Sequence, residues 1–187
     1  MKPTFRTSQP GSAADPAIPH VILVGLPGSG KSTVGQAVAS QTGRTFLDLD
    51  QEIERREGRS ITQIFGENGE LYFRKRERQL TEELALVGNM IVAPGGGWMT
   101  VPAVVALVRP PSRIVYLKVR PETALKRLGP MRLARPLLSR PDPLGELKRL
   151  FDERRSSYET ADYVVDTELY NLQRVIEMVI QLASPSG

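Results

Sequence analysis

Several residue types that carry common protein chemistry are absent or rare in this sequence of 187 residues. With no cysteine, the chain can form no disulfide framework, thiolate metal site or thiol nucleophile. Its one histidine, His20, excludes relays and metal sites that need several imidazoles. The sequence contains no run of about 18 apolar residues, the length that a membrane-spanning helix needs. Residues 1–19 also lack the apolar core of a secretory signal. We therefore expect a cytoplasmic protein without a membrane partner.

The sequence also lacks long blocks of like charge. Lysine and arginine total 25 against 21 acidic residues, a formal net charge of +4. Cations and acids are interleaved, as in EIERREGR and FRKRERQLTEE, whereas nucleic-acid proteins usually carry a basic stripe or cluster. The pattern favours a small anionic ligand over nucleic acid. Nothing resembles a coiled-coil zipper or an internal repeat, so we expect a monomer.

The chain divides into a proline-containing leader, residues 1–19, which we expect to be disordered, and a single domain at residues 20–183. Within the domain, short apolar runs alternate with segments of helical periodicity. This alternation predicts an α/β fold of three layers, in which a five-stranded parallel sheet carries helices on both faces. The expected strands are His20–Val24, Thr45–Leu49, Asn89–Ala93, Arg113–Leu117 and Tyr163–Val165. A segment rich in proline and arginine, about residues 129–143, forms no convincing element and is predicted to be a mobile or functional connection.

The first expected strand is followed by a phosphate-binding sequence. GLPGSGKS, residues 25–32, fits G-x-x-x-x-G-K-[ST] and opens a helical segment, which is the context this motif requires. Glycines let backbone N–H groups point at phosphate oxygens, and the helix N-terminus attracts negative charge. We expect Lys31 to neutralise phosphate charge and Ser32 to ligate Mg²⁺. The motif predicts ATP binding by Gly28, Ser29, Gly30, Lys31, Ser32 and Thr33.

Two carboxylates close the second expected strand, in the sequence FLDLD. Asp48 and Asp50 are two positions apart, so strand alternation would place both on one side at the carboxyl end of the sheet, where ligands bind such folds. There they could hold Mg²⁺ through water or accept hydrogen bonds from a substrate hydroxyl. One of them could instead cap the following helix.

Two further features are ambiguous when taken alone. Glu70 and Arg74 are spaced i, i+4 on an expected helix, where the carboxylate could hold the guanidinium in place or the pair could be a simple surface ion pair. Gly95, Gly96 and Gly97 follow the third expected strand. They could present bare backbone N–H groups to a ligand or form a flexible turn. Trp98 comes next and is expected to pack or to border a pocket.

Taken together, these motifs resemble the shikimate kinase family. The resemblance runs from about residue 20 to residue 180 and includes GLPGSGKST, FLDLDQEIE, the pattern IFxxxGExxFRxxE, the glycine triplet, RPLL, and Arg154 four residues before Tyr158. Kinases of gluconate or of nucleoside monophosphates share the phosphate-binding sequence but not the full set. The resemblance implies a P-loop kinase that transfers the γ-phosphoryl group of ATP to the 3-hydroxyl of shikimate, with a mobile lid at about residues 129–143.

The same resemblance implies roles for individual residues. Asp50 matches the carboxylate that grips the substrate hydroxyls and is the favoured base, and Asp48 matches the residue near Mg²⁺. Arg74 and Arg154 match the arginines that clasp the shikimate carboxylate, and Gly95–Gly97 match the glycines whose N–H groups complete that site. Arg135 matches a lid arginine that covers the phosphates. Arg127 and residues 166–171 are expected near the nucleoside.

Some readings stay open at this point. The family usually has a small residue or asparagine and then Pro-Leu-Tyr after the arginine, whereas this chain has Arg155-Ser156-Ser157-Tyr158, so Arg155 competes with Arg154 for the carboxylate. Arg132 and Arg140 could assist the lid or be solvated. Other functions also remain: a kinase for another small polyol acid or a nucleoside monophosphate, or a regulator that binds ligand without turnover.

Overall fold

The structure is a computed structural model that describes residues 18–130, 138–139 and 141–184. The expected leader and most of the expected lid, with Arg132, Arg135 and Arg140, lie outside the described residues. No helix of the described part is long and apolar enough to cross a membrane.

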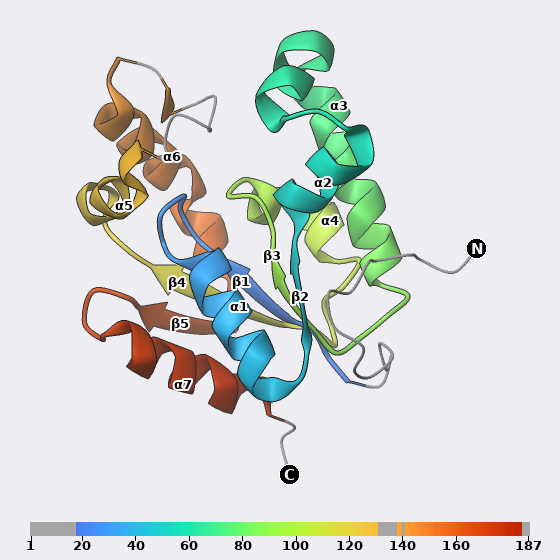
Figure 1. Ribbon diagram of the computed structural model, residues 1–187, viewed down its shortest axis with the longest axis vertical. Coiled ribbons are helices and arrows are strands. Elements are labelled where there is room, and N and C mark those ends of the chain that lie inside the picture. Colours follow the sequence, from blue (N-terminus) through green and yellow to red (C-terminus); the bar gives the residue numbers. More distant parts are fainter. Residues whose placement is uncertain (1–17, 131–137, 140, 185–187) are drawn as a thin grey trace.

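The centre of the fold is a five-stranded parallel sheet with strand order β2-β3-β1-β4-β5 (Figure 1). This confirms the predicted sheet. The strands begin or end within one residue of the expected limits, because each contains the apolar run from which it was predicted. Their bounds are β1 Val21–Val24, β2 Thr45–Asp48, β3 Met90–Ala93, β4 Arg113–Lys118 and β5 Tyr163–Asp166.

Helices cover both faces of the sheet and enclose two apolar cores. Alternate residues of β1 face opposite sides: Val21 and Leu23 pack with helices α1 (Lys31–Thr42) and α7 (Leu172–Ala183), whereas Ile22 and Val24 lie in the other core. That second core also contains residues of α3 (Ile61–Leu84), α4 (Pro102–Val105), α6 (Pro143–Tyr158) and the short helix η1 (Trp98–Thr100). Burial on both faces explains why β1 and β3 are apolar throughout.

Two pairs of helices stand beyond the carboxyl edge of the sheet, one on each side (Figure 1). One pair is α2 (Leu49–Glu57) and the upper part of α3, and the other is α5 (Pro121–Leu128) and α6. Helix α3 is broken at Gly69, whose φ of 76° is non-helical, so residues 70–84 form a separate straight segment. Because all strands are parallel, the loops after β1, β2 and β3 converge on this edge between the two pairs.

Candidate active site

The loop after β1 has the shape of a phosphate cradle. Gly28 has a φ of 84°, and a Cβ at this position would lie 2.3 Å from the Ala124 carbonyl oxygen, so a side chain is excluded by both backbone conformation and space. Gly30 is left-handed as well, with a φ of 97°, and it is the N-cap of α1. The amide groups at the start of α1 therefore directly follow the loop, as anion binding at a helix N-terminus requires.

The side chains of Lys31 and Ser32 form hydrogen bonds with different partners. The Lys31 ammonium donates to the carbonyl oxygens of Gly25 and Leu26, at 2.9 and 3.1 Å, and so folds back over the cradle. The Ser32 hydroxyl donates to Asp48 Oδ2 at 2.8 Å. A serine hydroxyl and a carboxylate side by side are the hard oxygen ligands that Mg²⁺ prefers. These two side chains fit a Mg²⁺ ion that would also be bound by phosphate oxygens and water.

The two aspartates do not share a strand face, so that part of the sequence argument is wrong. Strand β2 ends at Asp48 and α2 begins at Leu49, because Asp48 accepts a hydrogen bond from the Gln51 N–H and caps the helix. Asp50 lies in the first helical turn. From there its carboxylate faces the loop after β3: a Cβ on Gly95 would lie 2.7 Å from Asp50 Oδ1. Asp48 thus caps the helix and accepts a hydrogen bond from Ser32, whereas Asp50 faces the glycine triplet.

The glycine triplet lies between Asp50 and two arginines. A Cβ on Gly96 would approach Arg154 Nη1 to 2.7 Å, and a Cβ on Gly97 would approach Arg74 Nη2 to 2.4 Å. No other residue type permits guanidinium groups this close to the backbone. The triplet therefore has a carboxylate at its Gly95 end and cations at its Gly96 and Gly97 end. The residues that the sequence predicted for the acceptor site are brought together.

Arg154 and Arg155 point in different directions. Arg155 is exposed and forms an ion pair with Glu159, one turn later on α6, with Nε 2.7 Å from the carboxylate. Arg154 is half-buried beside Gly96. Of the two neighbouring arginines Arg154 and Arg155, only Arg154 therefore lies at the glycine triplet.

The sequence analysis missed Glu77 as a member of this site. Arg74 is held by two acids of α3: it donates to Glu70 Oε1 from Nη2 at 3.0 Å and to Glu77 Oε2 from Nη1 at 2.8 Å. The expected i, i+4 pair of Glu70 and Arg74 is present. Glu77, however, is the buried partner of Arg74, with 2% of its surface exposed. The sequence contained a signal for this contact. The pattern FRxxE places Arg74 and Glu77 three residues apart, which is close enough for contact on one helix face.

Glu77 holds a proton more firmly than an ordinary carboxyl group. Burial raises its pKa from 4.5 to about 7, and the negative charge of Asp50 adds to the rise, while Arg74 and Arg154 act in the opposite direction. The Glu77 Oε1 atom is buried and accepts no hydrogen bond from a described residue. This oxygen faces Gly95, where a Cβ would lie 3.3 Å from it.

The raised pKa predicts a pH dependence of stability. Between about pH 4.5 and pH 7 the native protein binds a proton at Glu77 that the unfolded chain does not, so this group's contribution to stability is present at low pH and is lost as pH rises through about 7. Glu77→Gln removes the titration. Urea unfolding from pH 5 to pH 8 should show the free energy of unfolding of the wild type falling relative to that of the variant.

A matched control for this experiment is Glu82→Gln, because Glu82 is exposed on the same helix in an ion pair with Arg78. Its stability difference from the wild type should vary little with pH. Parallel pH profiles for the wild type and Glu77→Gln would contradict the assignment of a raised pKa to Glu77.

Arg127 contacts the other segment that was predicted to border the nucleoside. Its guanidinium donates to Thr167 Oγ1 and to the Thr167 carbonyl oxygen, both at 2.7 Å. This contact joins α5 to the segment of residues 166–171, so the two parts predicted to border the nucleoside lie together. Arg135 lies outside the described residues.

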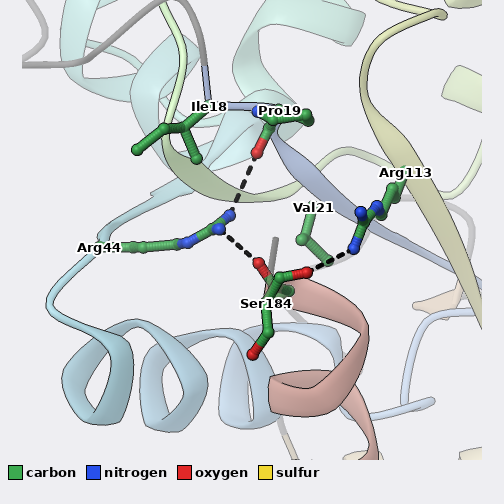
Figure 2. A pocket seen from close by; sticks show the side chains of 7 residues that line it. Ile18, Pro19, Val21, Arg44, Arg113 and Ser184 are labelled. Carbon is green, nitrogen blue, oxygen red and sulfur yellow. Dashed lines mark hydrogen bonds between the residues drawn. The ribbon is translucent and has the colours of Figure 1, made fainter. Parts of the chain in front are cut away.

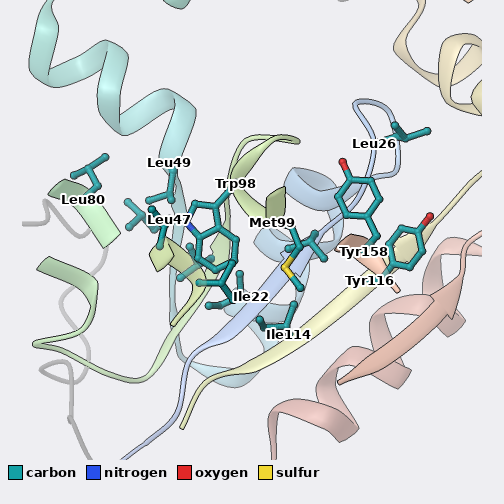
Figure 3. Packing of buried hydrophobic residues seen from close by; sticks show 14 of the residues in the cluster. Ile22, Leu26, Leu47, Leu49, Leu80, Trp98, Met99, Ile114, Tyr116 and Tyr158 are labelled. Carbon is teal, nitrogen blue, oxygen red and sulfur yellow. The ribbon is translucent and has the colours of Figure 1, made fainter. Parts of the chain in front are cut away.

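Trp98, which directly follows the glycine triplet, packs in the hydrophobic core. It is 1% exposed and lies among the buried residues of Figure 3. Its indole Nε1 donates to Thr81 Oγ1 at 3.0 Å. Thr81 in turn donates to the Glu77 carbonyl oxygen, one turn earlier on α3. The residue after the triplet is thus tied to the helix that carries Arg74 and Glu77.

A hollow at the opposite edge of the sheet has a structural explanation. Figure 2 shows Arg44 and Arg113 reaching toward the end of α7, where they donate to the carbonyl oxygens of Ala183, Leu182 and Ser184. The last carbonyls of a helix lack partners within the helix, and cations stabilise that end. Since Val21 and Arg113 begin their strands, this hollow lies at the amino edge, away from the phosphate cradle.

The chain is similar to known proteins over nearly its whole length. A family model for shikimate kinase matches residues 27–183. A shikimate kinase of Caldanaerobacter subterraneus subsp. tengcongensis is 35% identical over 162 residues, which cover 87% of this chain and 94% of that protein. A shikimate kinase of Nitrosomonas europaea is 38% identical over 180 residues, with 96% and 83% covered.

Solved structures agree with the sequence matches. The shikimate kinase from Acinetobacter baumannii, in complex with shikimate, has a TM-score of 0.82 and 35% identity to this chain, and the match covers 89% of this chain and 93% of that one. The phosphate cradle, the polarised glycine triplet and these matches lead to one conclusion: the chain belongs to the shikimate kinase family.

Proposed function

We propose that this protein transfers the γ-phosphoryl group of ATP to the 3-hydroxyl of shikimate. The observation that carries the proposal is the charge distribution along the glycine triplet, with Asp50 at Gly95 and arginines at Gly96 and Gly97. A small molecule with hydroxyls at one end and a carboxylate at the other matches this arrangement. A phosphorylated acceptor would bring its negative charge close to Asp50 and Glu77, which disfavours a nucleoside monophosphate.

ATP binds in the cradle formed by the loop after β1 and the start of α1. Lys31 exchanges its carbonyl partners for phosphate oxygens and stabilises the charge on the transferred group. Ser32 and Asp48 hold Mg²⁺, which supplies further charge stabilisation when bound. Arg127 borders the nucleoside, and Arg135, on the strength of the family resemblance, covers the phosphates.

The acceptor is held by its carboxylate and reacts at its hydroxyl. Arg74 and Arg154 present guanidinium groups, whose planar fork suits a carboxylate. Asp50 orients the 3-hydroxyl and accepts its proton as the oxygen attacks the γ-phosphorus. One phosphorus–oxygen bond forms to the shikimate oxygen, the bond to the bridging oxygen breaks, and ADP leaves with that electron pair.

The acceptor site is partly formed before the acceptor binds. Arg74 is already held by Glu70 and Glu77 before any ligand binds. The acceptor therefore meets cations whose positions are fixed, so the entropic cost of ordering them is small. We further expect the enzyme to act as a monomer in the cytoplasm.

Phosphorus NMR of the reaction mixture tests the proposal. Mg-ATP and shikimate should give one phosphate monoester for each ADP, with phosphorus coupling to the carbon that bears the 3-hydroxyl. ADP formed with inorganic phosphate in place of the ester would overturn the assigned acceptor. An ester on another hydroxyl would contradict the role of Asp50.

A further inference from the structure

Tyr158 is a buried tyrosine at the end of α6 that the mechanism above does not use. Its side chain is fully buried and stacks on Tyr116 of β4, with ring centroids 5.0 Å apart and an interplanar angle of 24° (Figure 3). Its hydroxyl donates to the Gly96 carbonyl oxygen at 2.6 Å. The phenol therefore contacts the middle of the glycine triplet from within the core.

Every carbonyl oxygen of the triplet is engaged by the protein itself. Gly95 O accepts from the Trp98 N–H at 3.0 Å, Gly96 O accepts from Tyr158, and Gly97 O accepts from the N–H and hydroxyl of Thr100 at 3.1 and 2.7 Å. The N–H groups of Gly95, Gly96 and Gly97 donate to no described residue. The carbonyl oxygens of the triplet thus bond to the protein, and its N–H groups remain for a ligand.

The Tyr158 bond determines which way one of these donors faces. The peptide between Gly96 and Gly97 is trans, so its carbonyl and its N–H point in opposite directions. With Gly96 O on Tyr158, the Gly97 N–H faces away from the tyrosine. Gly97 is also the residue in closest approach to Arg74.

The glycines that the site requires also make this peptide easy to turn. Arg154 and Arg74 leave no space for a Cβ on Gly96 or Gly97. Without Cβ atoms, the intervening peptide can rotate by half a turn at little steric cost. Its orientation must therefore be fixed by a hydrogen bond, and Tyr158 supplies it.

We propose that Tyr158 is a positioning residue whose hydroxyl holds the Gly96–Gly97 peptide so that the Gly97 N–H joins Arg74 in binding the acceptor carboxylate. This inference rests on the proposed function, since it assigns a further determinant of the same acceptor site. Burial raises the pKa of Tyr158, and so its hydroxyl stays a proton donor at neutral pH.

Tyr158→Phe tests the inference because it removes only the hydroxyl and keeps the stacked ring. Loss of one hydrogen bond of this kind corresponds to a rise of about three- to tenfold in KM for shikimate. The KM for ATP should change less than about twofold, since the Tyr158 hydroxyl donates to Gly96 and not to any described residue that is predicted to bind ATP. A purely structural role would move both constants or neither.

Tyr116→Phe is the matched control, as it removes the hydroxyl from the other ring of the same stack. Both KM values of this variant should stay within about twofold of those of the wild type. A second probe is the carboxamide of shikimate, which lacks the charged carboxylate. With this acceptor the effect of Tyr158→Phe should shrink below about twofold.

A nitrogen-labelled wild-type sample tests the inference even if Tyr158→Phe fails to fold. The amide resonance of Gly97 should shift when shikimate is added, and an unshifted Gly97 resonance would overturn the inference. Equal kinetic constants for Tyr158→Phe and Tyr116→Phe, or an equal rise in both KM values, would also overturn it. Wild-type protein that does not phosphorylate shikimate would overturn the proposed function and this inference together, whereas the other results overturn this inference alone.

Discussion

Replacing Asp50 with asparagine is expected to lower kcat for shikimate phosphorylation at least about a hundredfold, the usual contribution of a general base. Asparagine keeps the size of the side chain and can still contact a hydroxyl, but it accepts no proton at neutral pH. The KM for ATP should stay within about twofold, because Asp50 faces Gly95 rather than the phosphate cradle. Initial rates of ADP release over a range of both substrates measure these constants.

The control for this variant is Asp152→Asn, which removes an exposed carboxylate from α6. It should turn over shikimate at the wild-type rate. If Asp50→Asn retained more than about a tenth of the wild-type kcat, the base assignment would be wrong, and Asp50 would serve only to orient the hydroxyl.

The second large effect is expected for Arg74→Ala, which should raise the KM for shikimate at least about thirtyfold. Arg74 is largely buried and is held beside Gly97 by Glu70 and Glu77, so its removal takes away both a cation and a fixed donor. It also leaves Glu77 without the guanidinium that lowers its pKa, so that carboxyl group binds its proton more firmly. The KM for ATP should change less than about threefold.

Two further variants separate the contributions of Arg74. Arg78→Ala, one turn later on the same helix, removes an exposed arginine paired with Glu82 and should leave both KM values unchanged. Arg74→Lys keeps the charge but not the fork, and we expect a KM for shikimate between those of the wild type and Arg74→Ala. Equal increases in the KM values for shikimate and ATP would contradict a carboxylate-binding role.

The parts of this protein that could be predicted from sequence are those fixed by local rules. The strands are short apolar runs, and the phosphate cradle needs glycines at Gly28 and Gly30 for backbone conformation and a helix directly afterwards. Both signals lie within a few consecutive residues. They led to the correct sheet, and they predict the nucleotide at the edge where parallel strands bring their carboxyl ends together.

The acceptor site was harder because its contacts join distant segments. Asp50 was expected on strand β2, but the cap at Asp48 starts the helix earlier and turns Asp50 toward Gly95. Glu77 was overlooked because the FRxxE spacing shows that it can reach Arg74 but not that its carboxylate is buried. The choice between Arg154 and Arg155 likewise depends on which side of α6 faces Gly96, and the sequence pattern left that open.

The central claim is the identity of the acceptor, and a comparison of acceptors tests it most directly. ADP release from Mg-ATP would be measured with wild-type protein and shikimate, and in parallel with quinate, gluconate, AMP and CMP. The account predicts rapid turnover with shikimate, little with the others, and little hydrolysis without an acceptor. Turnover that favours another acceptor would contradict the assignments of Arg74 and Arg154, and turnover with none of them would contradict the assignment of a kinase activity to this chain.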